Sequence, residues 1–180
     1  MKNEKEVDDF NREFREKQEK RAEERSFYER TKQQYIDDNL IPIRPYWHLK
    51  KSDLDLTKQD FTPSVEISSF GFEVIESVGV EALLNTMQDG NPALFRSKDL
   101  FHHCWDGIKI SNVIRHWGNL EKLIPPTIIH NHLLNKLYVI DGKHRFHVAY
   151  YFNIDTIPIV IPVSHKIQIV KLLKQHGAIK

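Results

Sequence analysis

The pattern of hydrophobic and polar positions along this chain changes near residue 38. Residues 1–38 mix acidic and basic residues in a helix-forming composition and contain no Gly and no Pro. Val7, Phe10 and Phe14 follow i, i+3, i+7 spacing, but this apolar stripe lapses over the following turns. The pattern predicts a charged helical extension that is solvated along much of its length. A dedicated partner-binding arm is the alternative.

Residues 39–105 give weaker local signals. Two prolines and several bulky apolar residues predict an ordered, extended linker over 39–51. Strand-like pieces occur within 64–75, and a short helix is expected over 79–88, ending near Gly90. A further helix over 91–105 would turn four large apolar side chains inward, namely Leu94, Phe95, Phe101 and Trp105.

From residue 111 onward the alternation of apolar and turn residues is sharper. Ser111 is a candidate N-cap for a helix through about Trp117, with Gly118 as its stop. Two apolar runs, at 126–130 and 136–140, predict strands that are joined by a polar turn. These two strands are expected to form a hairpin.

The remaining residues predict an alternation of helix and strand. A helix is expected over 143–153, and the β-branched run 156–163 is typical of a buried strand. Ser164 would cap a final helix that reaches about His176 and stops at Gly177. The helix 143–153, with the strands before and after it, predicts a right-handed parallel βαβ unit.

Composition sets only broad limits. The chain has 180 residues, 40% hydrophobic and 28% charged, so residues 39–180 suffice for a single domain with a core. A formal net charge of +1 gives no global argument for nucleic acid or a membrane surface. Cys104 is the only cysteine, and the N-terminus lacks an apolar leader, so a cytoplasmic location is expected. No stretch approaches the length of a membrane span.

The segment Asp141-Gly142-Lys143-His144-Arg145 places polar residues where a strand should end and a helix begin. Cations in the first turn of a helix oppose its dipole, which indicates that an anion such as phosphate binds there. Arg145 can bind phosphate oxygens through two hydrogen bonds, Lys143 supplies a point charge, and Gly142 permits close approach. Asp141 can orient His144 or hold a divalent metal ion.

Two simpler interpretations of this segment stay open. Asp is a good N-cap residue, so Asp141 can cap the helix while the neighbouring bases are solvated. His144 and His147 are separated by one helical turn, and an H-x-x-H spacing can place two imidazoles on one face. Without a carboxylate or cysteine nearby, this pair is a weak zinc signal, and helix packing or a phosphate contact is the expected role of His147.

The stretch "PPTIIHN…LYVIDGKHRFHVAYYFNIDTIPIVI" resembles the core of the ParB/sulfiredoxin-like superfamily over roughly residues 110–163. In that family a strand leads into a short box of Gly and basic residues, which opens a helix with a small residue one turn on. An "IPV"-type strand follows. Here Gly142-Lys143-His144-Arg145 stands at the box and Ala149 at the small position. The resemblance implies an α+β fold with a small mixed sheet and packed helices, and a box that binds a nucleotide such as ATP or CTP.

Two departures from the family pattern change the implied activity. Sulfiredoxin carries its catalytic cysteine inside the box, where Lys143 stands in this chain. The partition-protein branch carries an acidic residue in its G-E-R-R box, where Lys is again found here. Neither sulfinic-acid reduction nor partition-type CTP switching is therefore expected. ParB-like nuclease domains with a related D-G-x-H-R box remain the better comparison.

These observations favour an enzyme that acts on phosphate esters, either by hydrolysing a nucleoside triphosphate or by metal-assisted cleavage of DNA. Its predicted catalytic residues are Asp141, His144 and Arg145, with Mg²⁺ held by Asp141. Its predicted phosphate-binding residues are Gly142, Lys143, Arg145 and His147. The alternative is a non-catalytic nucleotide- or DNA-binding regulator, including a phage or plasmid effector, that docks on a partner protein through its N-terminal helix. A homodimer stays open, and no membrane partner is expected.

Two further clusters contain residues that could take part in a site. His102 and His103 are adjacent, and neighbouring side chains of a helix or strand point to different sides, so they are not expected to share a metal ion. Cys104 is expected to be a small core residue. His130 and His132 belong to the predicted hairpin turn and can approach the box if that turn lies at the same edge of the sheet.

Overall fold

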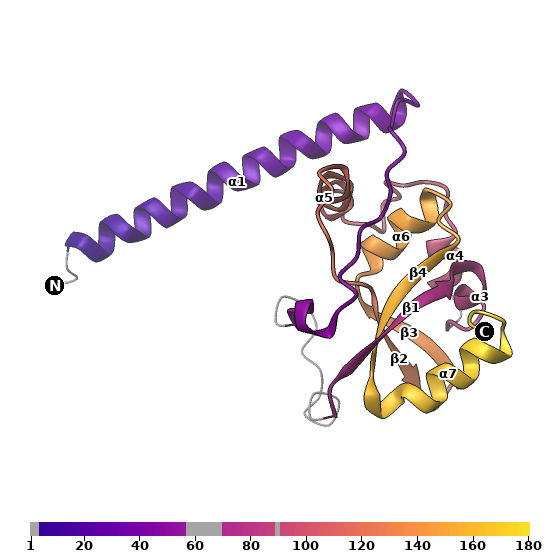
Figure 1. Ribbon diagram of the computed structural model, residues 1–180. Coiled ribbons are helices and arrows are strands. Elements are labelled where there is room, and N and C mark those ends of the chain that lie inside the picture. Colours follow the sequence, from indigo (N-terminus) through magenta and orange to yellow (C-terminus); the bar gives the residue numbers. More distant parts are fainter. Residues whose placement is uncertain (1–3, 57–69, 89–90) are drawn as a thin grey trace.

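The structure is a computed structural model that describes residues 4–56, 70–88 and 91–180. Within these ranges the chain is an α+β protein with a long N-terminal helix and a small mixed sheet, as predicted (Figure 1). Its α-helices are α1 (Glu4–Ile36), α3 (Val80–Leu84), α4 (Asn91–Phe95), α5 (Gly107–Gly118), α6 (Lys143–Tyr151) and α7 (Lys166–Gln175). Its strands are β1 (Phe72–Gly79), β2 (Thr127–Asn131), β3 (Lys136–Asp141) and β4 (Thr156–Pro162), and two short 3-10 helices are η1 (Lys51–Asp53) and η3 (Val163–His165).

The four strands form one sheet in the order β1-β4-β2-β3. β1 pairs with β4 and β2 with β3 in antiparallel fashion, whereas β2 and β4 are parallel. The predicted parallel βαβ unit is therefore wrong, because β3 and β4 run in opposite directions and β2 lies between them. Helix α6 sits at one end of the sheet, so the chain leaves along β4 from the end at which β3 delivered it (Figure 1).

The strongest local patterns gave correct elements. Every residue of β4 except Thr156 is buried, as the β-branched run predicts. The hairpin β2–β3 and helix α6 also lie where they were expected, each within two residues at its ends. Helix α7 ends beside Gly177, whose φ of +69° allows the chain to reverse.

Other predicted boundaries are wrong for identifiable reasons. The helix expected over 91–105 ends at Phe95, because side chains then bond the backbone locally: Ser97 Oγ accepts from the Asp99 amide, and Asp99 accepts from the Phe101 amide. Helix α5 begins at Gly107 rather than at Ser111. Asp106 caps it by accepting bonds from the amides of Ile108 and Lys109 at 3.0 and 3.2 Å.

Two further helix boundaries differ from those predicted. Ser164 lies inside η3, and α7 begins at Lys166 without a side-chain cap. Helix α3 ends early, because the residues after it pair with β3 through a bridge between Met87 and Leu137. Strand β1 overlaps only the last part of the stretch 64–75, whose residues 64–69 lie outside the described ranges, as does Gly90.

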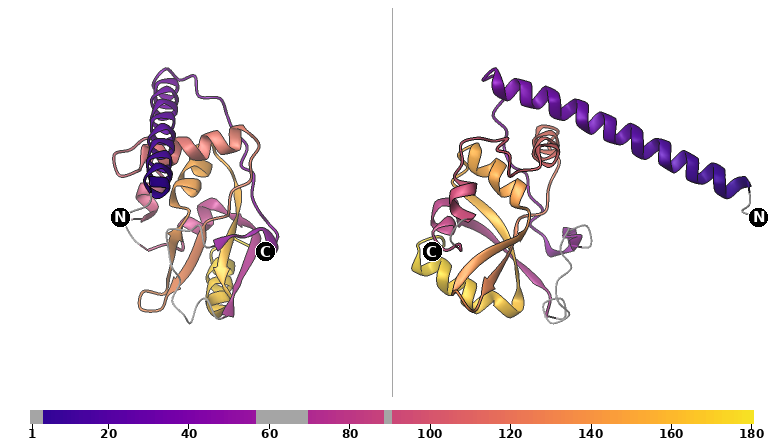
Figure 2. Two further views of the ribbon diagram at one scale, coloured as in Figure 1. Left: turned by 90° about the vertical axis from the view of Figure 1, so that its left-hand side faces the viewer. Right: turned by 180° about the vertical axis from the view of Figure 1, so that it is seen from behind.

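Helix α1 projects from the rest of the chain, and its first half forms a separate arm in Figure 1 and in the right-hand view of Figure 2. Val7, Phe10 and Phe14 on this arm are exposed, as expected of a solvated helix. The last turns of α1 are attached to the body by aromatic contacts, in which the rings of Tyr28 and Tyr35 lie 5.8 and 5.5 Å from that of Phe101.

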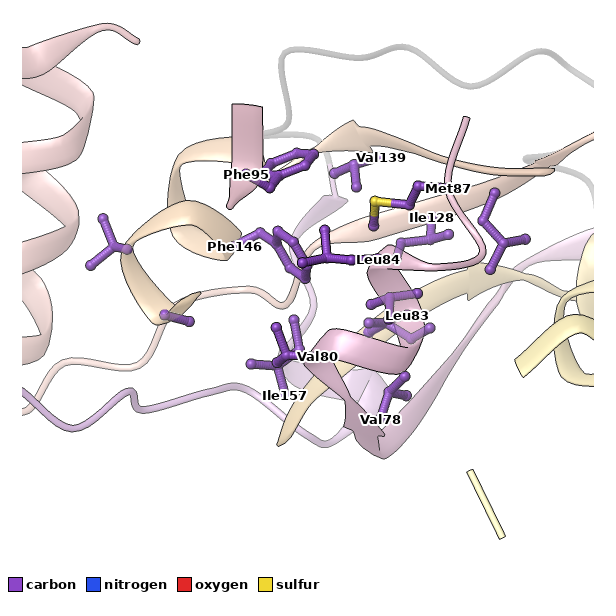
Figure 3. Packing of buried hydrophobic residues seen from close by; sticks show 14 of the residues in the cluster. Val78, Val80, Leu83, Leu84, Met87, Phe95, Ile128, Val139, Phe146 and Ile157 are labelled. Atoms are coloured by element: carbon purple, nitrogen blue, oxygen red, sulfur yellow. The ribbon is translucent and has the colours of Figure 1, made fainter. Parts of the chain in front are cut away.

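The core lies between the sheet and the helices that flank it. Figure 3 shows Phe95 and Phe146 among aliphatic side chains of the sheet and of α3. The Phe95 and Phe146 rings meet edge to face, 4.8 Å apart, which joins α4 to α6. The core contacts of Phe146 thus fix α6, and they hold its N-terminal turn in place beside β3. No helix within the described ranges combines the length and apolar character that a membrane crossing needs.

Candidate functional site

A pocket of about 720 Å³ lies at the junction of β3 and α6. Its volume is within the usual range for small-molecule sites. Four separate parts of the chain form its walls: the segment around η1, one face of α5, the loop after α5, and the β3–α6 junction. Its lining residues are His48, Asp53, Asp55, Lys109, Asn112, Val113, His116, Glu121, Lys122, Leu123, Ile124, Asp141, Gly142, His144 and Arg145.

Gly142 sets the geometry of the junction. Its φ of +79° lies in the left-handed region, which side chains other than Gly rarely adopt. A Cβ atom there would lie 2.8 Å from Pro126 Cα and 3.0 Å from Arg145 Nη2. The glycine therefore serves both the turn from β3 into α6 and the close packing of that turn on the chain before β2.

Asp141 is paired with Arg145 rather than with the helix backbone. The carboxylate bonds Arg145 Nη2 across one helical turn, and the two side chains are only 12% and 17% exposed. The N-cap of α6 is Gly142, and no side chain caps the helix. The simpler interpretation of Asp141 as a cap is thus wrong, and the pair holds the guanidinium group beside the first turn of α6.

The structure brings four of the predicted site residues together at the pocket: Asp141, Gly142, His144 and Arg145. The other two are placed elsewhere. Lys143 extends over the ring of Tyr138, with its Nζ atom 5.1 Å from the ring centroid. His147 is fully buried and stacks on the Trp105 ring at 4.7 Å. Neither residue lines the pocket.

Both histidines of α6 are held in the neutral form by their surroundings. Burial, and after it the nearby Lys109 charge, lower the pKa of His144. Burial also lowers the pKa of His147. The backbone carbonyl groups of Phe95, Leu100 and Asp99 partly offset this second shift, without forming hydrogen bonds of normal geometry. At neutral pH, His144 therefore offers the pocket an uncharged imidazole.

Two further histidines of the pocket, His48 and His116, were not predicted. His116 Nδ1 lies 2.5 Å from Glu121 Oε2, and this bond lowers the pKa of the Glu121 carboxyl group. The backbone brings the two together, because Leu120 has a φ of +60° and the Glu121 amide donates to the His116 carbonyl at 2.8 Å. The available signal was a histidine in the last turn of a helix, followed by Gly118 and an acidic residue.

Charged residues of both signs surround these groups. Lys109 of α5 and Lys122 after it add positive charge, and exposed Asp53 and Asp55 add negative charge from the η1 side. Lys122 has no ion-pair partner among the residues that the structure describes. It is thus the pocket cation whose charge is most available to an anionic ligand.

The groups around Asp141 do not suit the predicted Mg²⁺ ion. The Asp141 carboxylate is already hydrogen-bonded to Arg145. Mg²⁺ requires several oxygen ligands in nearly ideal octahedral geometry. Over the described part of the chain, the one group of three converging His, Cys, Asp or Glu side chains lies elsewhere, at residues 102–104. This arrangement does not fit a metal ion held by Asp141.

Comparison of the chain with protein-family models, with curated proteins and with solved structures found no match. The resemblance to the ParB/sulfiredoxin-like superfamily therefore stays a prediction, which rests on residues 110–163 alone. The chemistry of the pocket is therefore the basis on which a function can be inferred.

Proposed function

We propose that the pocket at the β3–α6 junction binds a nucleotide and hydrolyses a bridging phosphorus–oxygen bond of its phosphate chain or of a nucleic-acid backbone. One observation carries the proposal: a cavity of nucleotide size joins the first turn of α6 to cations and histidines from separate elements. The phosphate would lie at this turn, where the first amide groups of a helix have no partner within it.

Three side chains would bind the phosphate. Arg145 lies beside the α6 N-terminus and presents its planar guanidinium group there. Lys122 adds charge from the loop after α5, and neutral His144 can donate a hydrogen bond to a phosphate oxygen. This differs from the sequence-based hypothesis, in which Lys143 supplied the point charge and Asp141 held a metal ion.

His116 is the best candidate for the general base. Its Nδ1 atom bonds Glu121, which leaves Nε2 to accept a proton, and the carboxylate stabilises the imidazolium that forms. In the proposed step a water oxygen attacks phosphorus and gives its proton to His116 Nε2. The bond from phosphorus to the leaving oxygen breaks, and that oxygen takes a proton from solvent.

The experiment compares hydrolysis of nucleoside triphosphates and nicking of a plasmid, each with Mg²⁺ and with chelator, for the wild type and two pairs of variants. His116→Asn should lower turnover at least ~100-fold without changing ligand binding, and Lys122→Ala should weaken binding. The matched controls are His176→Asn and Lys174→Ala, at the C-terminal end of α7 and outside the pocket lining. Equal turnover in His116→Asn and wild type would exclude this histidine as the base.

One observation favours the second candidate, a non-catalytic nucleotide-binding regulator. Asp141 and Arg145 neutralise each other, so an anion must compete with a carboxylate for the guanidinium group. A site built for repeated phosphate turnover has no evident need of that competition. Binding that Lys122→Ala weakens, with no turnover under any of these conditions, would establish this alternative.

A further inference from the structure

The tight turn formed by residues 101–105 gathers His102, His103 and Cys104 on one side. One ligand atom from each of the three side chains lies within 4.8 Å of the others. The two imidazole rings are 4.1 Å apart, and Cys104 is exposed. The expectation of a buried, structural Cys104 is therefore wrong.

Residues 102–104 were not expected to share a metal ion, because a helix was predicted over 91–105. In a helix or strand, adjacent side chains point apart. Helix α4, however, ends at Phe95, and residues 101–105 form turns, so consecutive side chains can converge. Because residues 102–104 are not part of a helix, their side chains can bind one metal ion together.

Contacts on both sides fix the shape of this turn. At its N-terminal end, the Phe101 ring packs between Tyr28 and Tyr35. The Tyr35 hydroxyl also donates a hydrogen bond to the Asp99 carboxylate at 3.3 Å. After it, the Trp105 amide donates to the His102 carbonyl at 2.8 Å, and the Trp105 ring stacks on buried His147. Because both ends are anchored, little ordering is left for a bound ion to impose.

We propose that His102, His103 and Cys104 form a binding site for a borderline divalent cation, with Zn²⁺ as the preferred ion. A thiolate with two imidazoles suits Zn²⁺, Co²⁺ and Ni²⁺, and excludes the oxygen-seeking Mg²⁺ and Ca²⁺. Three protein ligands leave the fourth tetrahedral position to water, as the exposure of the turn allows. This site is separate from the pocket and does not rest on its proposed function.

Binding changes two existing features of the turn. The Cys104 amide donates to His102 Nδ1 at 3.3 Å, longer than a usual hydrogen bond, and ligation of the ion through that nitrogen would replace this bond. The thiol gives up its proton when the metal–sulfur bond forms, so binding releases a proton to solvent.

The experiment titrates untagged full-length protein with Co²⁺ and then displaces it with Zn²⁺. Because Cys104 is the only cysteine, a thiolate-to-cobalt charge-transfer band in the absorption spectrum can come from no other residue. We expect one equivalent of Co²⁺ to bind per chain and to quench part of the tryptophan fluorescence through Trp105. Addition of Zn²⁺ should remove the charge-transfer band. Cys104→Ser should abolish the band, and His103→Ala should weaken Zn²⁺ binding at least ~10-fold.

The matched control is His132→Ala. His132 is also exposed and lies beside the rings of His130 and His165, but the ligand atoms of these three histidines do not converge as those of residues 102–104 do. This variant should bind Co²⁺ and Zn²⁺ as the wild type does. The proposal is overturned if no charge-transfer band forms, if His102→Ala and His103→Ala both bind as tightly as the wild type, or if sedimentation shows one ion shared between two chains.

Discussion

The substitution Gly142→Ala tests the geometry on which the pocket depends. Two costs follow from the structure. A φ of +79° strains any residue with a Cβ atom by roughly 1–2 kcal/mol. The new Cβ would also lie 2.8 Å from backbone Cα of Pro126, and relieving such a contact typically costs about 1–3 kcal/mol. Together they should lower the free energy of unfolding by about 2–5 kcal/mol.

Two other glycines separate these costs. Gly177 has a φ of +69°, but an added Cβ would meet nothing within 4 Å, so Gly177→Ala measures backbone strain alone. Gly118, at the end of α5, has neither a positive φ nor a close neighbour, and Gly118→Ala should be neutral or stabilising by up to about 1 kcal/mol. The difference between Gly142→Ala and Gly177→Ala then gives the contribution of the Pro126 contact.

Urea denaturation followed by circular dichroism measures all three variants on one scale. With a denaturant slope of about 1–3 kcal/mol per M, Gly142→Ala should lower the midpoint by roughly 1–3 M. The order of stability should be Gly118→Ala, then Gly177→Ala, then Gly142→Ala. If Gly142→Ala unfolds at the same urea concentration as Gly177→Ala, the junction is not closely packed and the geometric argument fails.

Three further predictions concern the surroundings of the pocket. Arg145→Met should lower the free energy of unfolding by about 3 kcal/mol, because it leaves the nearly buried Asp141 carboxylate unpaired. Arg96→Met, which breaks the more exposed pair with Glu81, should lower it by less than about 1 kcal/mol. Asp106→Ala should cost about 1 kcal/mol through loss of the α5 cap, with Asp106→Asn close to the wild type. Burial lowers the pKa of His147 in the folded state, so the unfolded chain binds more protons at acid pH. Stability should therefore be full above about pH 6.5 and fall as the pH drops below it, and His147→Phe should flatten that slope. An unchanged slope in the variant would assign the pH dependence to other groups.

Local patterns in the sequence predicted those elements whose cause is local. The apolar run of β4, the hairpin turn after β2 and the stop at Gly177 each depend on a few neighbouring residues. The order of the strands depends instead on which edges pair, and nothing local indicated that β4 would join β2 rather than β3. For the same reason the helix over 91–105 was overestimated, since bonds from Ser97 and Asp99 outweigh helical spacing.

The candidate site divides in a similar way. Asp141, Gly142, His144 and Arg145 could be predicted because they are contiguous and stand where a strand meets a helix. The remaining walls could not, since they come from segments that only tertiary packing brings together. The pair of His116 and Glu121 depends on the left-handed conformation of Leu120, and a Leu gives no warning of a positive φ. Consecutive residues at 102–104 were dismissed because a turn was taken for a helix.

The charges of the pocket are compensated in pairs, and this bears on how an anion would bind. Arg145 is balanced by Asp141, and the Glu121 carboxylate is engaged by a hydrogen bond with His116. A phosphate at the α6 N-terminus would share Arg145 with Asp141, and the two anions would repel each other unless the carboxylate moved or took a proton. Lys122 carries no such compensation among the described residues. The first contact of a ligand is therefore expected at Lys122, and the exchange of Arg145 from Asp141 to phosphate would decide between binding alone and catalysis.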